Sequence, residues 1–277
     1  MDFINDLLQY GYLGNAFWAS ILSGISCALV GLYVVARRMV FLAGGITHAS
    51  FGGLGMALYA GWNPIPGALM VAILSAIGIE RASERGKIRQ DSMIGIIWSI
   101  GMAIGVLFMS LRPGYTSGDM AAYLFGSIIT VTRGDLLALA CLTAIIVVGA
   151  LLWLRPIMYV AFDRNFAQSR AIAIRTVSYL MAILTAATIV LSIRIMGIIL
   201  LLALITMPVV IANLLSQSYR KIALTAPLIA VAGNLTGLVI SYEWEVPPGA
   251  AIIFTLTLGL IVVKLLTLSR NKRTHKA

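Results

Sequence analysis

The sequence predicts an all-α, polytopic integral membrane protein that forms a single domain over residues 1–277. Hydrophobic residues make up 60% of the chain and charged residues only 11%, whereas soluble domains carry about a quarter charged residues. Apolar stretches follow one another along the chain, and no polar segment between them is long enough to fold separately. We therefore expect about 8–10 transmembrane helices.

Nine stretches qualify as spans because each approaches the ~20 mainly apolar residues that a membrane-crossing helix needs. In chain order they are 16–36, 39–60, 67–79, 94–111, 136–154, 177–193, 196–215, 222–241 and 250–268. The third is short and can extend back to Pro64. Residues 1–15 can form an amphipathic helix on the membrane surface. The apolar piece within 113–132 is too short to cross alone, so it is an outer-face helix, a re-entrant segment or an extra half-span.

The distribution of basic residues orients these spans. Lys and Arg accumulate in short cytoplasmic loops. With nine spans, an N-terminus outside the cell leaves only Arg112, Arg133 and Arg194 on the outer side. The formal charge of +10 therefore reflects topology and requires no nucleic-acid partner. We expect the N-terminus outside and the C-terminus inside the cytoplasmic membrane.

Two of the expected inner loops, 80–93 and 155–176, are longer than a simple turn. The second mixes aromatic and aliphatic residues with Arg and Asp, contains no Gly and has no Pro after Pro156. This composition predicts a helix lying on the inner surface. Such a helix is held by anionic lipid or serves as a docking element for a cytoplasmic partner.

The span at 39–60 combines many glycines with a titratable side chain. It carries His48 between Thr47 and Ser50, and the other histidine of the chain, His275, lies in the C-terminal tail. An ionisable group inside a span is costly and usually faces a protein interior or a water-filled path. Glycines let neighbouring backbones approach closely. We therefore expect this helix to line a pathway.

His48, Thr47 and Ser50 are candidate ligands for a metal ion on that pathway, and Met207, beside Pro208, is a weaker one. A neutral imidazole binds zinc, manganese or iron-like ions, and hydroxyl oxygens can complete a transient shell. The alternative for His48 is a structural histidine that donates to a carbonyl between packed helices. Spacing alone favours that alternative.

The chain lacks the residues that would power transport or catalyse a reaction. It has no GxxxxGK[ST] phosphate loop, no HExxH motif and no acid in the middle of an expected span. We therefore expect no enzyme activity and no permanently bound cofactor. If the chain moves a solute uphill, the energy comes from another protein.

Six segments resemble, in order, the signature segments of one family. They are VARRMVFLAGGITHASFGGLGMAL, GIIWSIGMAIGVLFMSL, AAYLFGSIITVTRGDL, AFDRNFAQSRAI, GIILLLALITMPVVIA and VPPGAAII. Each is weak alone, but six in the right order are specific. The chain resembles the membrane permease subunit of the bacterial ABC importers for zinc, manganese and iron-type metal ions.

The resemblance implies a type II-like ABC importer permease fold and transport of a divalent transition-metal ion. It implies three partners: a second permease chain, with a homodimer expected, a cytoplasmic ATP-binding subunit, and an extracytoplasmic metal-binding protein. Residues 163–174 would form the coupling helix that the ATPase contacts. The contacting residues would be Asp163, Arg164, Phe166, Ala167 and Arg170.

One position departs from the family pattern. The family carries an Asp four residues before the histidine, and this chain has Gly44 there. Residues four apart share a helix face, so His48 would act without a neighbouring carboxylate. Such a site binds a dication less strongly, which suits fast release or a chelated cargo. Two alternatives are a permease for a metal chelate of the siderophore or cobalamin type, and a membrane anchor or sensor that transports nothing.

Overall fold

The computed structural model describes the chain except for residues 1–4, 7–8, 86–88, 113, 115–130 and 275–277. The helices of the described part are α2 (Gly11–Ala36), α3 (Val40–Tyr59), α4 (Pro64–Arg85), α5 (Gln90–Ser110), α7 (Arg133–Phe162), α8 (Arg164–Ser169), α9 (Ile174–Leu215), α10 (Tyr219–Trp244) and α11 (Pro248–Thr274). The predicted all-α class is confirmed. The expected outer-face or re-entrant segment at 113–132 lies mostly outside the described residues. Of the expected surface helix at 1–15, residues 1–4 and 7–8 lie outside them, and residues 11–15 belong to α2.

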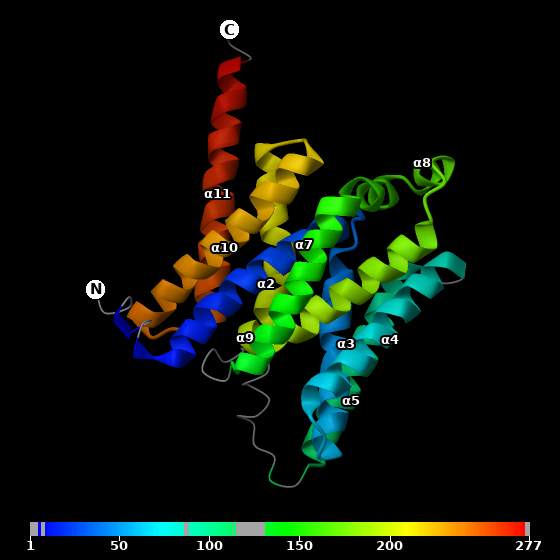
Figure 1. The fold of residues 1–277 in the computed structure, drawn as a ribbon, viewed down its shortest axis with the longest axis vertical. Helices are drawn as coiled ribbons and strands as arrows, with labels where there is room; N and C mark the ends of the chain where they lie inside the picture. Colours follow the sequence, from blue (N-terminus) through cyan, green and yellow to red (C-terminus); the bar gives the residue numbers. More distant parts are fainter. Residues whose placement is uncertain (1–4, 7–8, 86–88, 113, 115–130, 275–277) are drawn as a thin grey trace.

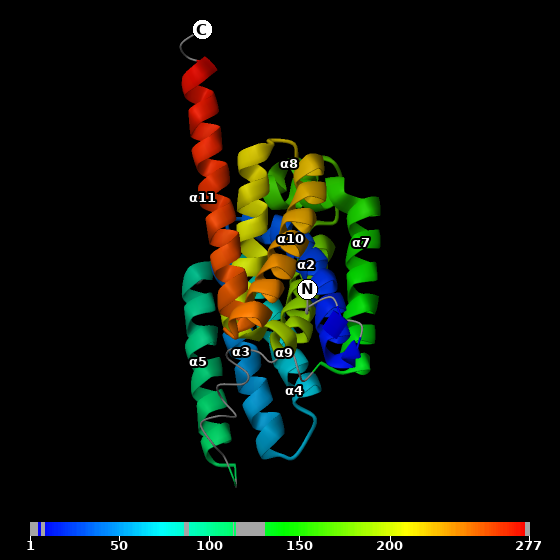
Figure 2. The same cartoon turned by 90° about the vertical axis from the view of Figure 1, so that its left-hand side faces the viewer.

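Nine helical stretches in the described part are long and apolar enough to cross a membrane. They agree with the nine expected spans, and Met196–Leu215 has the same bounds as its prediction. Successive spans run in opposite directions through the bundle (Figure 1). Consequently, α2 begins at the end of the bundle opposite to the one at which α11 finishes (Figures 1 and 2).

The long helix α9 contains two spans, Ile174–Ile193 and Met196–Leu215, that reverse direction at Gly197. Gly197 has φ 74° and ψ 166°, a backbone conformation that only glycine adopts without strain. The two halves run in opposite directions in both views (Figures 1 and 2). Because α9 packs against α2, α3, α4, α7, α10 and α11, it joins the two sides of the bundle.

The glycines of α3 bring it into backbone contact with α5. A Cβ atom on Gly52 would lie 2.7 Å from the carbonyl oxygen of Gly101, and one on Gly55 would lie 2.6 Å from that of Gly105. Such close approach is typical of small residues at membrane helix interfaces. With α4 and α9 packed on its other sides, α3 is the most deeply buried of the nine spans.

Helices extend further into the two inner loops than the sequence predicts. Helix α4 continues to Arg85, so Glu80, assigned to the loop 80–93, lies on a helix. Helix α7 bends at Trp153 (φ −121°, ψ 17°), close to Pro156, and continues to Phe162. Proline removes a backbone donor and bends a helix without always ending it. The short helix α8 follows, so the segment 155–176 is largely helical, as expected for its composition.

Helices α10 and α11 close the bundle beside α2 and α9. Helix α11 packs on α9 and α10. Its C-terminal part extends past the other helices in both views (Figures 1 and 2).

Candidate translocation site

His48 lies on α3 between two side chains of α5. Its ring stacks on the indole of Trp98, with centroids 4.1 Å apart and planes inclined by 17°. Its Nδ1 atom lies 3.1 Å from Sδ of Met102. Trp98 and Met102 reach the same imidazole because residues four apart share a helix face. The side chain of His48 is half-buried, so α5 fixes the orientation of the ring and leaves part of it accessible.

Trp98 also fills the space beside Gly44. A Cβ atom at position 44 would lie 2.8 Å from Cζ3 of Trp98, which is closer than real Cβ contacts. Because Gly44 stands one turn before His48, the indole lies along the face on which a side chain at position 44 would project. The indole of Trp98 therefore occupies the space that a carboxylate side chain at position 44 would need.

Thr47 and Ser50 are buried, and their hydroxyls are bonded within α3. The Thr47 hydroxyl donates to the Ala43 carbonyl at 2.6 Å, and the Ser50 hydroxyl donates to the Thr47 carbonyl at 2.6 Å. Hydroxyls in membrane helices commonly bond the preceding turn in this way. Met207 lies on α9, where its sulfur accepts a hydrogen bond from Thr257 of α11 at 3.9 Å. Among the four sequence candidates, His48 is held by α5 through a ring stack and a nitrogen–sulfur contact.

A closed metal site of several strong ligands is not present in the part of the chain that the structure describes. No group of three or more His, Cys, Asp or Glu residues there could hold a metal ion. His48 offers one imidazole nitrogen, with a soft thioether close by. Such a small donor set fits an ion that passes through better than one that stays.

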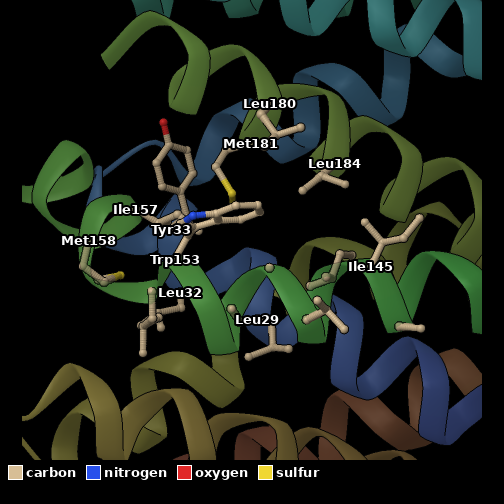
Figure 3. A pocket seen from close by; sticks show the side chains of 16 residues that line it. Leu29, Leu32, Tyr33, Ile145, Trp153, Ile157, Met158, Leu180, Met181 and Leu184 are labelled. Atoms are coloured by element: carbon tan, nitrogen blue, oxygen red, sulfur yellow. The ribbon is translucent and has the colours of Figure 1, made fainter. Parts of the chain in front are cut away.

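An apolar pocket of about 470 Å³ lies elsewhere, between α2, α7 and α9. Figure 3 shows side chains such as Leu29, Trp153 and Leu184 converging on it. Its lining is almost wholly apolar, and the Tyr33 hydroxyl at its edge accepts a hydrogen bond from Arg37 at 2.9 Å. A dication needs oxygen, nitrogen or sulfur ligands, so this pocket does not suit the cargo that His48 suggests.

The expected coupling segment forms α8, capped by Asp163. The Asp163 carboxylate accepts hydrogen bonds from the backbone N–H groups of Asn165 and Phe166, at 2.9 and 3.0 Å, so it supplies an N-cap. Ala167 is fully buried and anchors the helix. Phe166 packs edge-on against Tyr159 of α7, with ring centroids 5.1 Å apart.

The outward side of α8 combines an aromatic ring with a cation. Phe166 is 41% exposed, and the Arg170 guanidinium carbon lies 5.5 Å from the centroid of its ring. An exposed aromatic residue beside an arginine is typical of protein contact surfaces. The structure thus places Phe166 and Arg170 on an accessible surface, and Asp163 and Ala167 in positions that hold the helix.

Arg164, the fifth residue expected to contact an ATPase, is partly exposed and is paired with a buried acid. Its Nη2 atom lies 2.6 Å from Oε1 of Glu80, and Nη1 of Arg37 lies 2.9 Å from Oε2 of the same carboxylate. Burial acts to lower the pKa of the Arg37 guanidinium, but Tyr33 and Glu80 more than offset this effect and raise the pKa. Arg37 therefore stays charged beside Glu80.

Sequence reasoning missed three functional candidates: Trp98, Met102 and Glu80. Trp98 and Met102 are apolar residues in an apolar span, and their i, i+4 spacing was the one available signal. Glu80 stands at the end of a hydrophobic run next to other charges, which is also the pattern of an exposed loop.

Comparisons with known proteins agree over almost the full length of the chain. The family model of the ABC 3 transport family matches residues 9–267. A "probable metal transport system membrane protein" of Chlamydia muridarum is 35% identical over 273 residues, which cover 96% of this chain and 92% of the relative. The manganese transport system membrane protein MntC of Halalkalibacterium halodurans is 29% identical over 251 residues, covering 91% and 86%.

The fold is similar to that of a solved transporter. The match is to PsaBC from Streptococcus pneumoniae in complex with Fab, with a TM-score of 0.84 and 25% identity over 95% of this chain and 94% of that one. This similarity confirms the expected ABC permease fold. The chain therefore belongs to the ABC 3 transport family, and its helical bundle is that of the membrane permease of an ABC transporter.

Proposed function

We propose that the chain is the permease subunit of an importer that moves a divalent transition-metal ion, zinc, manganese or iron, across the bacterial cytoplasmic membrane. The observation that carries the proposal is His48, a half-buried imidazole on the most buried span of an ABC permease fold. An ionisable ring is costly to place inside a span, so it usually has a function there. Binding a cation that passes through the permease is such a function. The relatives named as metal and manganese transport proteins support this class of cargo.

The contacts of His48 suggest which ring atom meets the ion. Nδ1 lies against the Met102 sulfur, a weak acceptor. When Nδ1 carries the proton and donates it to this sulfur, Nε2 keeps the lone pair that a metal needs. A metal-bound histidine commonly has its other ring N–H fixed in this manner. Nε2 is therefore the proposed ligand atom.

Three partners complete the proposed transporter. A second copy of the chain would enclose the path, because His48 stays partly accessible in one chain. A cytoplasmic ATP-binding subunit would dock on α8 through Phe166 and Arg170. An extracytoplasmic metal-binding protein would deliver the ion to the outer ends of the spans. With the basic segments inside, the N-terminus is outside and the C-terminus inside.

The test is ATP-dependent uptake by vesicles that contain the chain together with its ATP-binding subunit, supplied with its binding protein. Uptake of zinc, manganese and iron is scored in one assay, and a siderophore chelate is included. We expect uptake of a free ion by the wild type, loss of uptake in His48→Ala, and normal uptake in the control Thr236→Ala. Thr236 is an exposed residue of α10 whose hydroxyl bonds its own helix.

The possible outcomes separate the alternatives. Equal uptake in the wild type and in His48→Ala would remove His48 from the path. Uptake of the chelate alone would favour a chelate permease. An assembled wild-type complex that hydrolyses no ATP in response to cargo and accumulates no metal would indicate an anchor or sensor.

A further inference from the structure

A buried carboxylate connects α8 to the helices around His48. Glu80, near the end of α4, is 2% exposed, and each of its two oxygens accepts from a different arginine. Arg37 follows directly after α2, three residues before α3 begins. Arg164 is the first residue of α8, and its Nη2 atom also lies 3.5 Å from the Ser178 hydroxyl on α9. Glu80 and its two arginines thus join α4 to the end of α2 and to α8, and Arg164 extends the contact to α9.

The physical cost of separating these groups makes the cluster act as a unit. A buried charge that loses its partner remains uncompensated in a poorly solvated place, and breaking such a pair is strongly unfavourable. If α8 moved while α4 stayed, Oε1 of Glu80 would lose Arg164. The lower-cost response is for α4 and the start of α3 to move together with α8.

Helix α4 can pass such a movement on to the helix that carries His48. It packs against α3. A Cβ atom on Gly67 of α4 would lie 2.9 Å from the carbonyl oxygen of Gly53 on α3. Backbones in such contact cannot shift separately without opening a void or overlapping. A displacement at α8 therefore has a continuous path to α3.

We propose that Glu80 is a positioning residue that couples the position of α8 to that of the α3–α4 pair, and hence to access to His48. The inference rests on the proposed function, because it assumes that an ATP-binding subunit moves α8. It assigns to Glu80 no contact with the metal and none with nucleotide. Arg37 and Arg164 are the two ends of the link, on the α3 side and the α8 side.

The experiment compares metal moved with ATP hydrolysed in the assembled, reconstituted complex. Glu80→Gln keeps the size of the side chain and removes its charge. We expect this variant to retain ATP hydrolysis, while the number of metal ions moved per ATP falls at least about fivefold, the lower end of usual coupling strengths. The matched control is Asp91→Asn, which removes an acid from the exposed Arg89–Asp91 pair on the same side of the bundle.

A second variant tests the link at its other end. Arg37→Gln leaves α8 untouched, and we expect the same fall in metal moved per ATP. It also serves as the test if Glu80→Gln does not assemble. If the cluster had a purely structural role, the variants would lower the yield or the thermal stability of the complex. The number of metal ions moved per ATP by the complexes that do assemble would then stay at its wild-type value.

An unchanged ratio in these variants, with a wild type that couples uptake to hydrolysis, would overturn the inference and leave the proposed function standing. A wild type that moves no metal would instead overturn the proposed function. The two failures are therefore distinguishable within one assay.

Discussion

Trp98 packs so closely against Gly44 that the size of one residue limits the size of the other. A Cβ atom at position 44 would meet Cζ3 of the indole at 2.8 Å and Cη2 at 3.4 Å. The same indole stacks on His48. The side chain at position 98 therefore governs both the space at position 44 and the orientation of the candidate ligand.

The Gly44–Trp98 contact predicts that a carboxylate cannot simply be introduced beside His48. Gly44→Asp should destabilise the protein by about 1–3 kcal/mol, because it overpacks this contact. Adding Trp98→Ser should recover part of the loss, since the smaller side chain vacates the space. The measurement is the thermal unfolding midpoint of the purified protein in detergent. Equal midpoints for Gly44→Asp with and without Trp98→Ser would contradict this packing.

Met102 is predicted to tune His48 through its sulfur, while its volume packs against the core. Met102→Leu conserves volume, so the free energy of unfolding should change by less than about 1.5 kcal/mol. Loss of the sulfur next to Nδ1 should weaken apparent metal affinity on the order of tenfold. The check is the initial rate of uptake against metal concentration. Met70→Leu, an exposed methionine of α4, is the control, and the idea fails if both variants match the wild type.

The backbone contact between α3 and α5 predicts a sharp difference between two glycine substitutions. Gly55→Ala places a methyl group 2.6 Å from the Gly105 carbonyl oxygen, and it should cost about 1–3 kcal/mol of stability. Gly95→Ala on α5 has no heavy atom within 4 Å of the new methyl group, so it should be neutral or slightly stabilising. Thermal unfolding of both variants, side by side, tests this. Similar melting of the two would argue against close packing.

The N-cap of α8 predicts an effect on subunit association. Asp163→Ala removes the acceptor for two backbone N–H groups, at a cost of about 1 kcal/mol. If α8 is the docking helix, the Kd for the ATP-binding subunit should rise about fivefold. Asp163→Asn keeps a capping oxygen and should bind almost as well as the wild type. Binding of the detergent-solubilised subunits gives both values, and equal Kd values for Ala and Asn would count against the cap.

The spans could be predicted because hydropathy is a local property of each segment. The stretch Met196–Leu215 can be recognised from its own residues alone. An imidazole within such a span, as at His48, also stands out in the sequence without any structure. Local patterns could not show which face of α5 meets α3, because Trp98 and Met102 are apolar residues in an apolar span. Which face of α5 packs on α3 depends on the contacts between the glycines of the two helices.

Glu80 illustrates a second kind of information that the sequence does not display. Its arginine partners are 43 and 84 residues away along the chain, and neither spacing follows a local rule. Helix propensity also continues through charged residues, so the end of hydrophobicity at Ile79 did not mark the end of α4 at Arg85. Burial of the acid is a property of the assembled bundle.

Helix α11 has 27 residues, which at 1.5 Å per residue give a length of about 40 Å. The hydrocarbon layer of a bilayer is only about 30 Å thick. The helix is therefore longer than the hydrocarbon layer, and the turns near its C-terminus are the ones that extend past the other helices (Figures 1 and 2). Removing these last turns would leave the packed part of α11 in place and would change the surface that a partner subunit contacts.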